Sequence, residues 1–317
     1  MWTSLAIGVA GGVAAAILFA AILGGGAFAL PLSLISPLPI AIVGLGWGTL
    51  PGFVAAIVAI ITVSSVMSPT VAFGFGLVTA LPMAYYAYLA GLARPADETG
   101  TGPATAAEWY PIGRIASRIA FVTAASLVVV GFVGGFSIES FVESFRLALA
   151  EAIDDPAEVA RLQDADTDGM IRLYVSLMPL TLALFWTGMM ALDLWLAAMV
   201  VRISGRFLRP KDDITVRFQL EPSLVAVFAV AVAVSFAPGE LGLVARAFAG
   251  ALAMVLSIAG FAVVHVLTRG NAARGIVLAT IYGVTLLFFS LPLLVMTVLG
   301  AADTLLGLRR RKLAGPD

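Results

Sequence analysis

Asp193 is the residue whose chemistry stands out most, because it lies in the middle of the apolar run FWTGMMALDLWLAAMVV. A carboxylate at the centre of a bilayer costs about 2.5–3.5 kcal/mol on insertion scales, so such groups face a polar cavity or a partner. Asp193 could bind a proton, a cation or a substrate amine. The structural alternative is an acid that pairs with an intramembrane arginine or is protonated inside the bundle.

Two tryptophans on the same run, Trp186 and Trp195, are candidate walls of a binding cavity around Asp193. They are nine positions apart, which at 100° per residue places them on opposite faces of a helix. At most one of them therefore lines a given cavity.

Breaks in an earlier apolar stretch supply the other candidate binding residues, Pro37, Pro39 and Gly46. Irregular backbone survives in a membrane only inside protein or beside water, so these breaks indicate a cavity. The alternative is close helix packing, since glycines four residues apart, such as Gly44 and Gly48, let backbones approach each other.

An acidic run after the middle of the chain, Asp164, Asp166 and Asp168 followed by Gly169, matches the opening of a calcium-binding loop. The match then fails, because the twelfth position is valine where a bidentate glutamate is needed, and the ninth is arginine. We treat these three aspartates as a weak metal site, with a solvated acidic turn as the alternative.

Composition decides the class of protein. Of the 317 residues 61% are hydrophobic and 12% are charged, and the mean hydropathy is +1.05. A soluble domain is about 45–50% apolar, so the solvent of this chain is lipid. The net charge of −1 gives no reason to expect nucleic acid, and a chain with one histidine and no cysteine lacks the common ligands of transition metals.

Signatures of soluble catalysis and of nucleotide binding are absent from the sequence, including a P-loop, G-x-S-x-G, H-E-x-x-H and a Rossmann fingerprint. An intramembrane protease would need a Ser–His pair or paired aspartates within the membrane. Among the acids only Asp193 is clearly intramembrane, and Asp303, close to the tail, is marginal. We therefore predict no cofactor and favour a protein that is not an enzyme. Without a P-loop, the chain cannot power transport by ATP on its own.

The fold predicted is an all-α, polytopic transmembrane bundle in one membrane domain covering residues 1–317. We expect eight spans, or nine if every apolar stretch crosses, since each crossing needs about 20 apolar residues. The second stretch is broken by prolines and the seventh is short. The nine stretches cover residues 5–23, 27–46, 52–67, 71–92, 115–136, 171–201, 222–236, 241–267 and 275–299.

Polar segments divide this domain into Gly/Pro-rich spans at 5–92, a loop at 93–112, an acidic insert at 138–169, the long span at 171–201, a basic loop at 202–221, spans at 222–308 and a basic tail at 309–317. In the insert, apolar residues from Ile138 to Ile153 recur at helical spacing with acids between them, which predicts an amphipathic helix at the membrane interface. A capping pattern at Asp155-Pro156 predicts a short second helix.

The basic residues predict the topology. If the tail lies on the same side as the loops at 94–118, 202–217 and 269–274, fourteen of the eighteen lysines and arginines share that side, which the positive-inside rule assigns to the cytoplasm. This requires residues 275–308 to fold back, for example near Pro292, or one earlier stretch not to cross. We favour the inside tail with eight true spans.

Four patterns resemble the YybS-like family of bacterial membrane proteins: PLPI…GLGWGTLPG, EWYPIGR, the acidic insert and the terminal GAADTLLGLRRR. That family is similar to the substrate-binding subunits of energy-coupling-factor transporters. The resemblance implies a helical bundle that binds a small molecule and borrows separate ATPase and coupling subunits. The present chain is longer and adds the insert and further C-terminal spans.

From these observations we predict a multi-pass protein of a bacterial inner membrane that binds or transports a small molecule, with the lipid bilayer and ATPase or coupling subunits as partners. The alternative is a membrane scaffold or assembly factor that acts through the acidic amphipathic helix and the basic cytoplasmic loops. A transporter needs a polar cavity at mid-bilayer, whereas a scaffold does not.

Overall fold

The computed structural model describes residues 2–95, 107–153, 165–211, 213–288 and 290–314. Nearly all of them are helical, and the strands within these ranges are β1 (Ala93–Pro95) and β2 (Ala107–Trp109), which pair antiparallel with Ala93 opposite Trp109. Seven helices are long and apolar enough to cross a membrane, or eight if the bent pair at the C-terminus counts as one span. The all-α polytopic prediction is confirmed.

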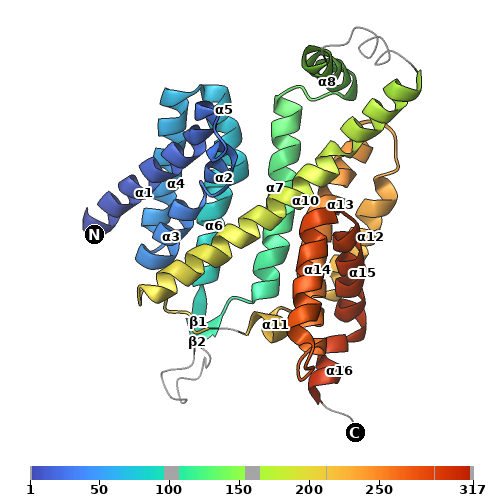
Figure 1. The fold of residues 1–317 in the computed structure, drawn as a ribbon. Coiled ribbons are helices and arrows are strands. Elements are labelled where there is room, and N and C mark those ends of the chain that lie inside the picture. The colour runs from blue at the N-terminus through green and yellow to red at the C-terminus, as the bar shows by residue number, and fades with distance from the viewer. Residues whose placement is uncertain (1, 96–106, 154–164, 212, 289, 315–317) are drawn as a thin grey trace.

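The first half of the chain forms a bundle of closely packed helices (Figure 1). Glycine makes this packing possible: Gly8 of the first helix lies against the backbone of Pro51, and the backbones of Gly44 and Gly52 touch each other. The elements are α1 (Trp2–Ala20), η1 (Ala21–Gly24), α2 (Ala29–Leu34), α3 (Leu38–Trp47), α4 (Thr49–Val66), α5 (Pro69–Phe75), η2 (Gly76–Ala80) and α6 (Leu81–Gly91).

A long helix, α10 (Ala165–Ile203), runs diagonally through the molecule and joins two apolar cores (Figure 1). With 39 residues it is about 58 Å long, far more than the ~30 Å of hydrocarbon, so it must tilt. Met190 and Val201 belong to the core of the N-terminal bundle, whereas Ala183 belongs to a second core formed with α7 (Ile112–Val133) and α13 (Gly239–Leu267).

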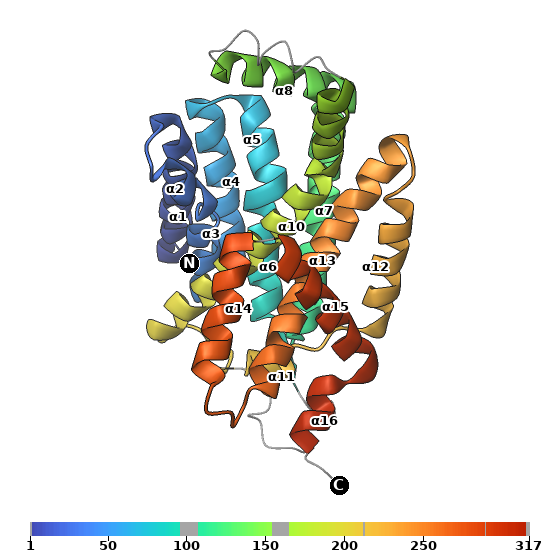
Figure 2. The same ribbon diagram turned by 45° about the vertical axis from the view of Figure 1, so that its right-hand side comes forward.

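The predicted amphipathic helix is present as α8 (Ile138–Ala152) and lies across one end of the molecule (Figure 2). Its apolar side packs on the start of α10, where Val142 contacts Ile171 and Val175, and its glutamates are exposed. Residues 154–164, including the predicted second helix after Pro156, lie outside the described residues.

The last apolar stretch folds back, which is one of the two arrangements that the charge distribution left open. It forms two helices, α14 (Arg274–Phe288) and α15 (Ser290–Leu306), followed after Gly307 by α16 (Leu308–Ala314), which is bent by 63° from α15. Figure 2 shows α14 rising beside α13 and α15 returning to the end where α14 began. At 15 residues α14 extends about 22 Å, which is shorter than the ~30 Å of hydrocarbon that a full span must cross.

The basic loops and the tail therefore meet at one end of the molecule. Arg269 pairs with Asp213 of the preceding loop, and Arg309 of the tail donates to the carbonyl oxygen of Phe218. The loop also holds α11 (Ile214–Arg217), from which α12 (Pro222–Val234) leads to the opposite end. With 13 residues, α12 is shorter than a full span.

Candidate functional site

Asp193 lies on the side of α10 that faces the interior, where it is fully buried. Leu194 and Ala197, the next buried residues of α10, belong to the same core as α3, α4 and α6. The helix thus holds the carboxylate inside protein rather than in lipid, as the sequence predicted for an acid at this depth.

Neither carboxylate oxygen of Asp193 has a hydrogen-bond partner among the residues that the structure describes. Arg246 does not pair with it: its guanidinium donates to the carbonyl oxygens of Ser235 at 3.0 Å and Ser176 at 2.9 Å. Thr187, two turns earlier on α10, also has a buried hydroxyl without a partner. Buried polar atoms are nearly always satisfied, so an orphaned carboxylate needs an explanation.

Irregular helix geometry occurs next to α10. The span from Pro69 to Gly91 is interrupted by η2, a π-helical turn, and the indole N–H of Trp186 donates to the carbonyl oxygen of Val78 within that turn, at 3.2 Å. Single π-helical turns are rare in proteins, and those that occur are often found at functional sites. Trp186 therefore connects the helix of Asp193 to this turn.

The other predicted cavity residues are divided between the interior and the surface. Pro37 is buried at the break between α2 and α3, and Pro39 is half-buried in the first turn of α3. Gly46 lies against Val201 of α10, eight residues and about 12 Å along the helix from Asp193. Trp195 is 48% exposed on the outer surface.

The acidic run shows ion pairing instead of clustered acids. Asp168 forms salt bridges with Arg146 of α8 and with Arg172, the latter at 2.8 Å. It lies within α10, Asp164 lies outside the described residues, and Asp166 is in the first turn of α10. Across the described ranges, no group of three acidic or histidine side chains could hold a metal ion.

Asp193 does not line either of two cavities found on the described part of the chain. The first, of about 230 Å³, is apolar except for Glu240 and lies between α7, α10 and α13. The second, of about 300 Å³, lies at the basic end beside the buried ion pair of Asp303 and Arg309. In this pair Nε of Arg309 lies 2.7 Å from Oδ2 of Asp303.

Sequence reasoning did not single out Glu240 or Arg309 as site residues. Glu240 carries a local signal, an acid at the start of a long apolar helix. Arg309 carries a weaker one, a basic residue six positions after Asp303 with Gly307 between them.

Comparisons with protein-family models, with curated proteins and with solved structures give no match to this chain. The fold and the site define a polytopic integral membrane protein whose longest described helix carries a buried carboxylate, with no partner among the described residues. The resemblance to the YybS-like family stays a prediction.

Proposed function

We propose that the chain is a small-molecule binding and transport component of a bacterial inner membrane, without an ATPase of its own. In this proposal Asp193 holds a proton, a cation or the amine of a substrate. The observation that carries the proposal is the fully buried carboxylate, whose two oxygens have no partner in the part of the chain that the structure describes.

The energetic argument is direct. An ionised carboxylate without a partner is costly in a low-dielectric interior, so Asp193 must be protonated or must hold a positive group. A purely structural acid would have its hydrogen bonds satisfied by the bundle, as Asp303 has. An acid that exchanges its partner is expected to lack a fixed one.

The surrounding helices support a site that changes shape. The π-helical turn η2 and the break at Pro37 give the N-terminal bundle two places where the backbone departs from regular helix. Helix α10 contributes to both apolar cores, so it connects the surroundings of Asp193 to the second bundle. Irregular helices beside a mid-membrane site are typical of transporters.

The test uses infrared difference spectra of the purified protein in nanodiscs, titrated with acid, with Na⁺ and with methylammonium. We expect a carboxyl band that appears on acidification and shifts with the cation, and that is absent in Asp193→Asn. Asp213→Asn, the same change in an exposed loop, should retain the band. A band that persists in Asp193→Asn would overturn the role of Asp193.

The partner part of the proposal follows from the resemblance to energy-coupling-factor subunits. It expects ATPase and coupling subunits to dock on the basic end, which the positive-inside rule places in the cytoplasm. Isolation of the tagged protein from its native membrane in mild detergent, followed by mass spectrometry, should recover them in stoichiometric amounts. Recovery of envelope or division proteins instead would favour a scaffold.

One observation favours that second candidate: the glutamates of α8, including Glu139 and Glu143, are exposed while its apolar side is occupied by α10. This acidic surface could bind an assembly partner. The double change Glu139→Lys and Glu143→Lys should then abolish recovery of that partner and leave cation binding at Asp193 unchanged. If the chain is a transport component, the double change should leave partner recovery unchanged, and Asp193→Asn should abolish cation binding.

A further inference from the structure

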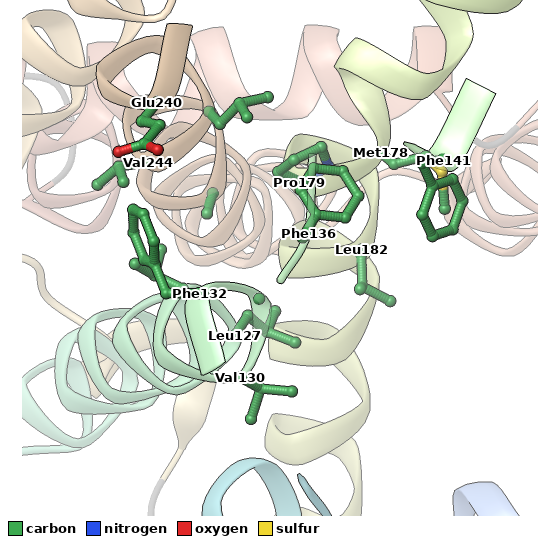
Figure 3. A pocket seen from close by; sticks show the side chains of 14 residues that line it. Leu127, Val130, Phe132, Phe136, Phe141, Met178, Pro179, Leu182, Glu240 and Val244 are labelled. Atoms are coloured by element: carbon green, nitrogen blue, oxygen red, sulfur yellow. The ribbon is translucent and has the colours of Figure 1, made fainter. Parts of the chain in front are cut away.

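The apolar cavity lies at the end of the molecule that carries α8. Its wall is built by the last turns of α7, by Met178, Pro179 and Leu182 of α10, and by the first turns of α13 (Figure 3). Phe132, Phe136 and Phe141 are among the lining residues. Its volume of about 230 Å³ compares with ~150 Å³ for an engineered cavity that binds benzene, so it has room for about nine non-hydrogen atoms.

Glu240 is the single acidic group in this lining. It lies in the first turn of α13 and is exposed, and no salt bridge joins it to another described residue. Figure 3 shows its carboxylate on the same side of the cavity as Val244 and the ring of Phe132. The cavity therefore combines an apolar interior with a negative charge beside an aromatic ring.

We infer that this cavity binds a cationic amphiphile, an ammonium head group on a short hydrocarbon chain. The carboxylate of Glu240 supplies charge complementarity for the head, and an aromatic ring of the lining, such as that of Phe132, can add attraction for a cation. Leu127, Leu182 and Ala247 receive the chain, which gains close van der Waals contact there. A sulfate or phosphate head would meet repulsion from Glu240.

The alternative explanation for Glu240 is that it stabilises α13, because an acid in the first turn interacts favourably with the positive end of the helix dipole. That role predicts a small change in stability and no preference among head groups. Ligand selectivity therefore separates the two explanations.

The experiment measures equilibrium binding of radiolabelled octyltrimethylammonium and octyl sulfate to the protein in nanodiscs, with empty nanodiscs as background. We expect saturable binding of the cation alone, weakened at least tenfold in Glu240→Gln and retained in Glu240→Asp. Leu182→Trp, at a partly exposed lining position, should fill the cavity and remove binding. Glu151→Gln, an exposed acid on α8 outside the lining, is the matched control.

Equal binding of both amphiphiles, or a change of less than twofold in Glu240→Gln, would overturn the inference. The inference is independent of the proposed role of Asp193, because Asp193→Asn should leave octyltrimethylammonium binding unchanged. A protein that fails the infrared test but binds the cationic amphiphile selectively would lose the first proposal and keep this one.

Discussion

Arg309 holds the C-terminal tail to a loop more than ninety residues earlier in the chain. Its guanidinium pairs with Asp303 at 2.7 Å and donates to the carbonyl oxygens of Thr215 at 2.8 Å and Phe218 at 2.6 Å. The side chains of the pair are 7% and 5% exposed. We predict that Arg309→Met strongly lowers the free energy of unfolding of the C-terminal half.

The magnitude follows from burial. Removing one member of a buried ion pair costs about 3–5 kcal/mol, because the other charge stays in a poor solvent. The two carbonyl oxygens also lose donors, at about 1 kcal/mol each if they stay dry. Local undocking of α16 would let water reach Asp303 and limits the total, so we expect about 3–5 kcal/mol. At 1.4 kcal/mol per decade this is a factor of roughly 10² to 4 × 10³ in the folding constant.

The assay is unfolding by SDS in mixed micelles, with limited proteolysis at the tail as a local readout. The double change Asp303→Asn with Arg309→Met should recover part of the loss, since no buried charge is then left alone. Arg311→Met, at an exposed neighbour, is the control and should change stability by about 0.5 kcal/mol or less. If Arg309→Met matches the control, the pair is solvated and the reasoning is wrong.

Two further predictions concern pH and close packing. Hydrogen bonds from Thr215 and from the guanidinium of Arg269 lower the pKa of Asp213. The contribution of Asp213 to folding stability is therefore present above the unfolded pKa of about 3.9 and is lost as pH falls through the folded value. Asp213→Asn should remove that part of the acid sensitivity of the basic end, measured by proteolysis against pH. A Cβ on Gly260 would collide with a carbonyl oxygen of α15, so Gly260→Ala should cost about 1–3 kcal/mol of stability in the same SDS assay. Gly283 has open space around it, so Gly283→Ala should be neutral or stabilising. Equal effects of the two changes would contradict the close contact at Gly260.

The fold was predictable where one property dominates. Composition alone required a helical membrane bundle, and the count of basic residues on each side favoured a tail on the cytoplasmic side, with a return of the last stretch as one of two ways to place it there. Helix α14 ends at Phe288 and α15 begins at Ser290, close to the position predicted from Pro292. Periodicity also predicted α8, because its apolar residues repeat along a single helix.

The site was predictable only in part, because its properties depend on residues distant in sequence. Asp193 could be identified by its depth in an apolar run, but the lack of a partner depends on where Arg246 points. The guanidinium of Arg309 in the tail donates to the carbonyl oxygen of Phe218, and no local sequence pattern predicts a contact between residues so far apart in the chain. The π-helical turn near Val78 likewise has no sequence signal in its five residues, Gly-Leu-Val-Thr-Ala.

The hairpin of α14 and α15 adds two helices to one part of the molecule. It starts and ends at the basic end, and Leu286, Leu287 and Phe288, at the far end of α14, are exposed apolar residues. Two helices of about 10 Å diameter have a combined cross-section of roughly 160 Å². If the hairpin stays within the leaflet at the basic end, we expect a membrane crowded with the protein to bend so that this leaflet lies on the convex face.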